Sequence, residues 1–273
     1  MLSKRLKQVG AHLLTIFASL VTVIPVYLIV VNSLKSRPEA SSMSAALPTV
    51  FHFENFATVI TAAKLATSFG NSILYATGST IIGTLFAAMA AFVLSRNKTR
   101  FNRFLYFFII LGIALPVNYF TLTKVMQITD LINTRIGMII LYAAGQIPFG
   151  VFLIYGFLDS IPRELDEAAI IDGCGPFQLF FQIIVPLLTP VLVTEAVLSF
   201  LGAWNNFIMP LYYLNNSANW PMTLSVYNFF GQYQQNWNLV SADVLMTILP
   251  VIVVYLAAQR YILSGMTAGA VKG

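Results

Sequence analysis

The sequence predicts an all-α membrane protein, a bundle of six transmembrane helices. Hydrophobic residues make up 58% of the 273 residues, charged residues only 9%, and the mean hydropathy is +0.79. Soluble domains hold roughly 45 to 50% apolar residues, so lipid is the solvent for most of this chain. A span needs about 20 apolar residues to cross about 30 Å of hydrocarbon. The expected spans are residues 12–34, 71–94, 104–123, 137–158, 186–206 and 240–262.

The distribution of Lys and Arg predicts the side of the membrane on which each loop lies. Six spans place both termini on one side, and basic residues gather in cytoplasmic loops. With both termini in the cytoplasm, ten of the 15 Lys and Arg residues lie inside and five lie outside. This topology accounts for the net charge of +5. The basic residues are scattered over short loops, so no nucleic-acid partner is predicted.

The N-terminal region is expected to be a retained span and not a cleaved signal peptide. Lys4, Arg5 and Lys7 precede it, but the charge-free run that follows reaches Leu34 and is longer than the 7 to 15 residues of a signal-peptide core. The expected organisation is a cytoplasmic segment 1–11, a first span 12–34, an external loop 35–70, a core transmembrane region 71–262 and a cytoplasmic tail 263–273.

The external loop is expected to contain an interfacial helix from about Glu54 to Thr67, because its apolar residues recur at helical spacing. This helix either lies on the membrane surface or contacts a substrate. Proline occurs in or at the edge of five spans, at Pro25, Pro116, Pro148, Pro186 with Pro190, and Pro250. Each proline removes a backbone donor and kinks its helix. Kinks suit a moving pathway but are also common in static bundles.

No catalytic constellation is visible in the sequence. The run GSTIIGT from Gly78 lacks the Lys of a phosphate-binding loop, so helix packing explains its glycines better. His12 and His52 are far apart, and neither HExxH nor GxSxG occurs. We therefore predict no enzymatic activity, no metal site and no cofactor in this chain. The alternative among enzymes is an intramembrane protease.

A cluster of acids lies between the fourth and fifth spans, in the loop 159–185. Five of the ten acidic residues fall there within 14 positions, at Asp159, Glu164, Asp166, Glu167 and Asp172. Such a cluster must be solvated or paired. The pattern predicts a helix capped by Asp159 or Ser160 and ended by Gly173, then a second short helix over about 176–185. Phenylalanines and Ile184 of the second helix are expected to anchor it to the bundle. Judged by its charge alone, the loop would be an ordinary solvated cytoplasmic loop.

The same loop carries a recognisable pattern. The run EAAIIDG from Glu167 to Gly173, followed by Ile183 and Pro186, resembles the EAA loop of ABC importer permeases, with Val185 where that family commonly has Leu. The chain is similar to the carbohydrate-uptake permeases of bacteria, of the kind of the smaller permease of the maltose system. The resemblance covers about residues 54–273.

This resemblance implies the type I ABC importer permease fold, in the bacterial cell membrane, with both termini cytoplasmic. It implies that the chain forms half of the translocation pathway for a sugar or oligosaccharide. The implied partners are ATPase subunits that bind ATP and Mg, a second permease subunit and an extracytoplasmic solute-binding protein. The alternative is a stand-alone secondary transporter or channel, which inverted repeats and paired intramembrane charges would favour.

Two cytoplasmic contacts with the ATPase are implied by the resemblance. The first helix of the loop would dock on the ATPase, and its candidate residues are Glu167, Ala168, Ala169, Asp172 and Gly173. The carboxyl-terminal run from Gln259 resembles the tail of the smaller sugar-permease subunit, with Ser264 where that family often has a basic residue. Read from its residues alone, this tail is flexible. The candidate tail contacts are Gln259, Arg260, Gly269 and Lys272.

Candidates for the pathway lie in the third and fifth spans. Glu195 is about 14 Å past Pro186 at 1.5 Å per residue, which is near mid-membrane. It either lines a cavity or forms a protonated structural bond to a neighbouring helix. Trp204 and Asn205 are similar to a segment of the sugar permeases and suit stacking on, and hydrogen bonding to, a sugar. Asn118 and Tyr119 are the further candidates, and an aromatic belt at the interface is the alternative.

Overall fold

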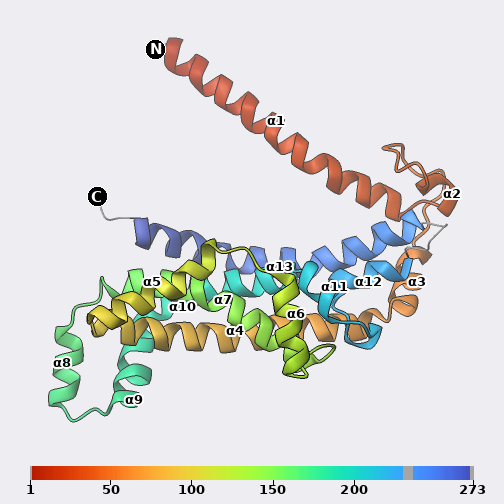
Figure 1. Cartoon of the computed structure of the whole chain (residues 1–273). Coiled ribbons are helices and arrows are strands. Elements are labelled where there is room, and N and C mark those ends of the chain that lie inside the picture. Colours follow the sequence, from red (N-terminus) through yellow and green to blue (C-terminus); the bar gives the residue numbers. More distant parts are fainter. Residues whose placement is uncertain (1, 230–235, 271–273) are drawn as a thin grey trace. The chain divides into compact units, whose positions relative to one another are not determined.

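The computed structural model describes residues 2–229 and 236–270, and the described part is helical without strands (Figure 1). The longer helices are α1 (Leu2–Ser33), α3 (Glu54–Ala62), α4 (Leu65–Arg96), α5 (Arg100–Ala114), α6 (Tyr119–Ile128), α7 (Arg135–Leu158), α8 (Glu164–Ile171), α10 (Val185–Trp204) and α13 (Trp237–Ala270). The shorter elements are α2 (Arg37–Ala40), α9 (Pro176–Gln178), the π-helix η1 (Leu179–Ile184), α11 (Ile208–Tyr213), η2 (Ser217–Asn219), α12 (Met222–Ser225) and η3 (Val226–Phe229).

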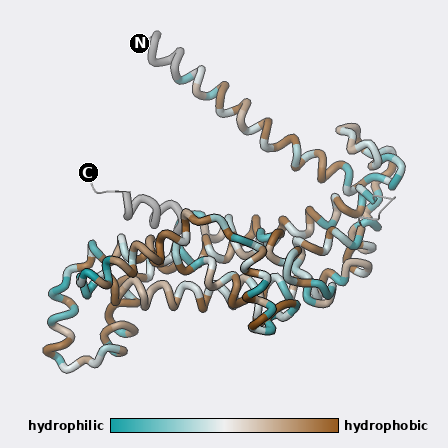
Figure 2. Tube along the Cα trace, viewed as in Figure 1, coloured by the Kyte–Doolittle hydropathy of each residue, from teal (hydrophilic) through white to brown (hydrophobic). Residues whose placement is uncertain are grey.

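Five helical segments of the described chain are long and apolar enough to cross a membrane, and a sixth span is possible only as a bent pair. The five are Gly10–Ser33, Leu65–Arg96, Arg135–Leu158, Pro176–Trp204 and Trp237–Arg260. Figure 2 shows apolar residues, in brown, along most of their length. Apolar helices of spanning length, which the composition predicts, are therefore present.

The span expected over residues 104–123 is not a continuous helix. α5 ends at Ala114, α6 starts at Tyr119, and the two helices are bent by 114°. Pro116 explains the break, because proline disfavours the helical conformation at the residue before it. Leu115 is accordingly extended, with φ −80° and ψ 127°. Asn118 then starts α6, since its side chain accepts hydrogen bonds from the backbone N–H groups of Phe120 and Thr121, both at 3.1 Å.

The described chain forms two compact units. The first contains the chain up to Ala66 together with Leu224–Pro250, and the second contains Thr67–Thr223 and the chain from Val251. In the first unit Asn55 of α3 joins three segments. Its Nδ2 donates to the carbonyl oxygens of Ser33 and Lys35 at 2.8 and 2.9 Å, and its Oδ1 accepts from Asn238 Nδ2 at 2.9 Å. The external loop is therefore folded onto the end of α1.

The interfacial helix is shorter than expected. α3 ends at Ala62, and Lys64 has a positive φ of 50°, so α4 starts at Leu65 as a separate helix. Asn55 and Val59 are its buried residues, and they face its own unit. In the same unit Asp243 of α13 is buried, and Ser225 Oγ donates to its two carboxylate oxygens at 2.7 and 2.9 Å. This acid holds the start of α13 against α12.

The second unit is built around α4, α5, α7 and α10, where α7 packs against both α5 and α10. Its core contains small side chains of α4, such as Ala87 and Ala91, beside branched side chains of α7 and α10. A Cβ atom on Gly150 of α7 would lie 2.8 Å from Ala87 Cβ, and one on Gly83 of α4 would lie 3.0 Å from Gln146 Oε1. The glycines of both helices thus permit close packing, as the GSTIIGT run predicts.

Candidate functional site

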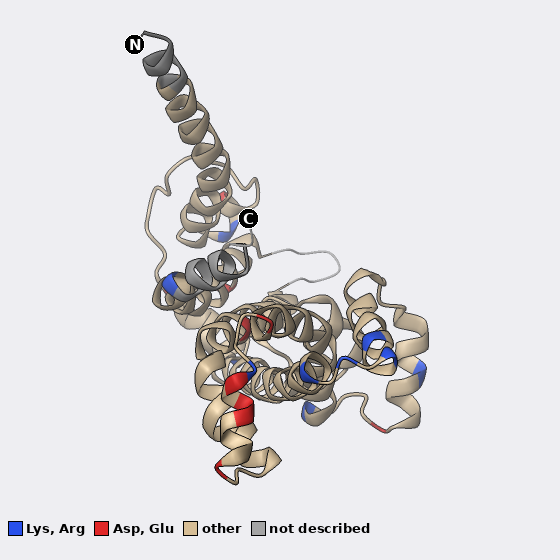
Figure 3. Cartoon of the chain, turned by 90° about the vertical axis from the view of Figure 1, so that its left-hand side faces the viewer, with Lys and Arg blue, Asp and Glu red and all other residues tan. Residues whose placement is uncertain are grey.

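The acidic loop forms a short helix, α8, at the end of the second unit where α4 and α7 also end (Figure 1). Figure 3 views this end and shows Asp and Glu, in red, concentrated on α8. Glu164, Asp166 and Glu167 occupy its first turn, where the helix dipole favours negative charge. The helix ends as the sequence predicts. Gly173 follows it with φ +85°, a conformation that favours glycine.

The start of α8 differs from the expectation. Neither Ser160 nor Asp159 caps the helix, which begins after Arg163 without a side-chain cap. Ser160 Oγ donates instead to the carbonyl oxygen of Phe157 at 2.6 Å, and Asp159 pairs with Lys98 Nζ at 3.3 Å. Both side chains therefore serve the end of α7.

The two faces of α8 divide the predicted coupling residues. Glu167, Ala168, Asp172 and Gly173 are exposed. Ala169 is only 4% exposed and belongs to the apolar core, so the expectation that it offers a small surface to a partner is corrected. Its small size lets α8 approach its own bundle. The exposed face also carries apolar side chains, since Ile170 is 60% exposed and Ile171 is 85% exposed.

Charged groups fasten the inner face of α8 to α4. Asp166, one turn before Ala169, has its Oδ2 2.6 Å from Arg96 Nε and accepts from Arg96 Nη2 through Oδ1 at 3.3 Å. Arg163, at the start of α8, donates from Nη2 to the carbonyl oxygen of Ser95 at 3.1 Å. An arginine at the end of α4 therefore binds α8, and an arginine at the start of α8 binds the end of α4.

The expected second helix of the loop is not separate. α9 continues as the π-helix η1 and then as α10, and the N–H of Val185 donates to the carbonyl oxygen of Phe180, five residues before it. Of the expected anchors, Phe180 and Ile184 are buried, whereas Phe177 and Phe181 are exposed. The loop thus leads without a break into a span.

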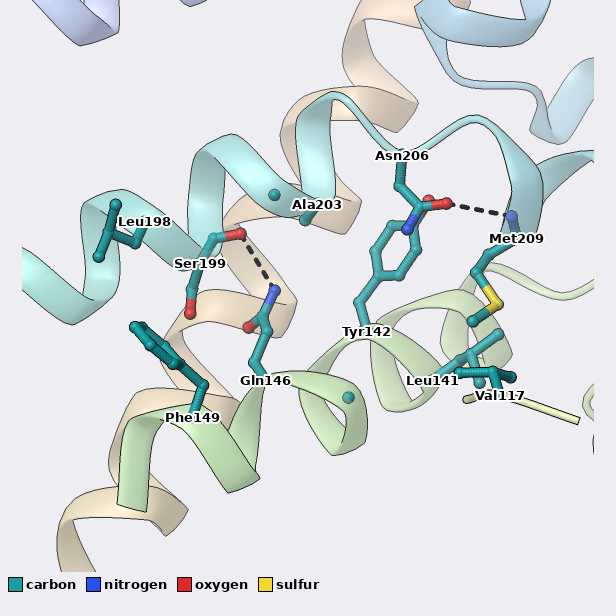
Figure 4. A pocket seen from close by; sticks show the side chains of 12 residues that line it. Val117, Leu141, Tyr142, Gln146, Phe149, Leu198, Ser199, Ala203, Asn206 and Met209 are labelled. Carbon is teal, nitrogen blue, oxygen red and sulfur yellow. Dashed lines mark hydrogen bonds between the residues drawn. The ribbon is translucent and has the colours of Figure 1, made fainter. Parts of the chain in front are cut away.

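A cavity of about 460 Å³ lies in the second unit, lined mainly by α7 and α10 (Figure 4). Its wall combines apolar side chains with polar ones from Tyr142, Gln146, Ser199 and Asn206. Gln146 Nε2 donates to the carbonyl oxygen of Ser199 at 3.1 Å, and Asn206 Oδ1 accepts from the N–H of Met209 at 3.0 Å (Figure 4). Hydroxyl and amide groups on an apolar wall suit an uncharged polar ligand.

Glu195 is placed outside this cavity wall. It is fully buried, Ser199 Oγ donates to its Oε1 at 2.6 Å, and Thr84 Oγ1 donates to its Oε2. A Cβ atom on Gly150 would lie 3.2 Å from Oε1, so the glycine leaves room for the carboxyl group. The geometry supports the second of the two sequence hypotheses, a structural bond from α10 to α4.

The other pathway candidates are scattered. Trp204 is 2% exposed and packs edge-on against Phe69 and stacked against Phe200, both with ring centroids 5.9 Å apart. Trp204 is a core residue in this structure, which corrects the prediction that its ring stacks on a sugar. Asn205 is exposed. Asn118 caps α6, as described above.

Tyr119 stacks on Tyr212 with ring centroids 5.0 Å apart. The two rings and Lys124 line a second cavity of about 500 Å³.

Comparison with known proteins decides the family. Residues 81–267 match the family described as the binding-protein-dependent transport system inner membrane component. The chain belongs to this family. It is therefore a permease subunit of a transport system and a multi-pass protein of the plasma membrane.

The sequences of similar proteins align with almost the whole length of the permease. It is 34% identical over 97% of its length to the probable starch degradation products transport system permease protein of Thermoanaerobacterium thermosulfurigenes, and covers 98% of that protein. It is 33% identical over 96% of its length to the melibiose/raffinose/stachyose import permease protein of Bacillus subtilis, and covers 97% of it.

Among solved structures, one chain of a bacterial ABC transporter involved in the import of the acidic polysaccharide alginate matches with a TM-score of 0.79 and 25% identity. The match covers 93% of the permease and 95% of that chain. The predicted fold class, an ABC importer permease, is confirmed.

The tail of the permease continues α13. Its backbone is helical to Ala270, so over the described part the tail is a continuation of the last span. Gln259 and Arg260 are exposed on this helix, and Gln259 Nε2 donates to the carbonyl oxygen of Leu256 at 3.2 Å. Gly269 lies on the same helix, and Lys272 lies outside the described residues.

The polar residues of the cavity in α7 were missed from the sequence. Gln146 is an uncharged polar residue in the middle of the long apolar helix α7, two positions before Pro148. A polar side chain at such a depth in a span indicates a functional position, and this signal is visible in the sequence. Tyr142 lies one turn earlier and has no such signal, since the ring of a tyrosine also packs well in an apolar core.

Proposed function

We propose that this permease is one membrane-spanning subunit of a bacterial ATP-driven importer and forms half of the pathway for a sugar or oligosaccharide. The names of its relatives support this substrate class, since they refer to starch degradation products and to melibiose, raffinose and stachyose. The cavity of Figure 4 fits such a solute, because Tyr142, Gln146, Ser199 and Asn206 offer hydroxyl and amide groups to its hydroxyls. A second permease subunit supplies the other half, and a solute-binding protein delivers the substrate outside.

The observation that carries the proposal is the exposed face of α8. This face carries Glu167 and Ala168 of the EAA pattern and combines the acids Glu167 and Asp172 with the exposed apolar side chains Ile170 and Ile171. Apolar groups exposed beside charges are typical of a surface that another protein covers. The ATPase docks here and binds ATP and Mg, so this chain itself hydrolyses nothing.

Basic residues support a cytoplasmic position for α8 and for both termini. Arg96, Lys98 and Arg163 all lie where α8 meets the ends of α4 and α7. Loops rich in Lys and Arg remain in the cytoplasm. If the bent pair α5–α6 counts as one span, the chain crosses the membrane six times. Both ends of the chain then lie on the same side as α8.

Substitution of Gly173 tests the docking surface. Gly173→Asp places a side chain at φ +85° and adds a negative charge to the exposed turn, so we expect normal insertion but loss of the co-purified ATPase by at least tenfold. Gly175→Ala is the matched control. Gly175 has an ordinary φ of −72°, and a Cβ there would meet only Gln178 Oε1 at 3.9 Å. If membranes with Gly173→Asp transport at the wild-type rate, α8 is not the docking helix.

A further inference from the structure

The guanidinium group of Arg96 joins three helix ends. Arg96 is the last residue of α4, and its Nε and Nη2 face the two carboxylate oxygens of Asp166 in α8 at 2.6 and 3.3 Å. Its Nη1 donates to the carbonyl oxygens of Leu158 and Ile161, where α7 ends, at 3.5 and 3.3 Å. The last carbonyls of a helix have no partner within the helix, so a cation is favourable there.

This contact is withdrawn from solvent. The side chains of Arg96 and Asp166 are only 12% and 13% exposed. A paired guanidinium and carboxylate at this depth hold a defined geometry, because Nη2 donates a hydrogen bond to Oδ1 while Nε lies in ion-pair contact with Oδ2, so two atoms of each group are engaged. The nearby pair of Lys98 and Asp159 is different, since its side chains are 58% and 33% exposed and it joins single atoms at 3.3 Å.

A second arginine, at the start of α8, also joins α8 to the end of α4. Arg163 of the α8 start donates to the carbonyl oxygen of Ser95, next to Arg96 in the chain. Ala169, one turn after Asp166, packs into the apolar core with Leu94 and Leu158, the last turns of α4 and α7. The inner face of α8 is thus held by an ion pair, by a hydrogen bond from an arginine side chain to a backbone carbonyl, and by apolar contact, while its outer face is exposed.

We propose that Arg96 is a positioning residue that transmits movement of α8 to α4 and α7. The inference rests on the proposed function, in which an ATPase moves α8. Without Arg96, α8 is joined to α7 by the short segment 159–163 and continues through α9 to α10, but its hold on α4 is weakened. The ion pair makes the ends of α4, α7 and α8 move as one body, so ATPase closure reshapes the bundle and does not only shift the loop.

The test compares three neutralising variants in the complete transporter with its ATPase, second permease and binding protein. In Asp166→Asn and Arg96→Gln, we expect the ATPase to co-purify at wild-type stoichiometry, with solute transported per ATP hydrolysed at least tenfold lower. Arg96→Gln/Asp166→Asn leaves no unpaired charge in the contact, so we expect it to be no worse than the single variants. Asp166→Glu, which keeps the charge, restores at least half of the ratio.

The exposed pair provides the control. Lys98→Gln/Asp159→Asn removes two charges from the same region, and we expect its transport per ATP to stay within twofold of wild type. The proposal is overturned if the double variant of Arg96 and Asp166 keeps the wild-type ratio. It is also overturned if that variant is lost from the membrane or loses the ATPase, because the ion pair would then serve folding or docking. If the wild-type complex shows no ATP-dependent transport, the proposed function itself fails.

Discussion

Glu195 places a carboxyl group deep inside the span that ends at Trp204, where a charge costs at least about 2.5 to 3.5 kcal/mol. Thr84 of α4 and Ser199, one turn further along α10, both donate to it. Gly150 of α7 leaves the space that the carboxyl group fills. These contacts tie α10 to α4 within the bundle, and they explain why an acid is tolerated without lining the cavity.

We predict that Glu195→Gln inserts normally and transports within about twofold of wild type, because the amide oxygen of glutamine accepts from one hydroxyl and its NH2 group can donate to the oxygen of the other. Glu195→Leu leaves Thr84 and Ser199 without their acceptor, at about 1 to 3 kcal/mol for a buried polar group. Its melting temperature in detergent should therefore fall. A Gln variant that is stable and assembled but inactive would instead assign the carboxyl group to the pathway.

The role of a single residue in a span is hard to read from sequence for a physical reason. Apolar side chains are spread around the whole circumference of α10, so periodicity does not tell which face meets the cavity and which meets the core. Trp204 was accordingly assigned to the pathway although it packs on Phe69, a contact between residues 135 positions apart. Gly173 was predictable, because the need for a positive φ after a helix is a local property.

Among the elements, local signals explain some breaks and not others. Pro116 and Asn118 account for the 114° bend between α5 and α6. A count of apolar residues alone does not reveal this bend. The π-helix Leu179–Ile184 carries no comparable signal. Its register is set by how the chain enters α10, whose second residue, Pro186, lacks an N–H.

The tail is an element whose contact stays a prediction. We expect truncation after Ser264 to leave insertion intact and to lower the ATPase activity of the assembled transporter several-fold, because it removes the last part of a helix that the ATPase would meet. Purified complexes and a coupled ATPase assay measure this. Replacement of 265–273 by a Gly-Ser segment of equal length controls for chain length. Unchanged assembly and ATPase activity would show that the tail makes no such contact.

At the scale of the whole molecule, apolar composition was enough for the fold class. Apolar length predicts the spans, because hydrocarbon thickness is fixed, and the comparisons confirm the family that the EAA pattern indicates. The fold of the external loop was not predictable, since Asn55 binds Ser33, Lys35 and Asn238 through contacts far apart in sequence. Such long-range polar contacts leave no periodic trace.

The proposed importer makes a simple prediction about the isolated chain. Purified alone into lipid vesicles, it should accumulate no sugar, because it contributes half a pathway and no energy source. Vesicles that also contain the ATPase and the second permease subunit, supplied with ATP inside and binding protein outside, should take up solute. Uptake by the isolated chain driven by an ion gradient would show that it is a secondary transporter.

The turn after α8 contains Cys174, the single cysteine of the chain, which is half-buried. A thiol-reactive fluorophore would therefore label this permease at one position without any engineered substitution. That position directly follows Gly173, beside the helix on which the ATPase is proposed to act. The native protein thus carries its own attachment point for an optical reporter, whose emission can be followed in real time as nucleotide is added and consumed.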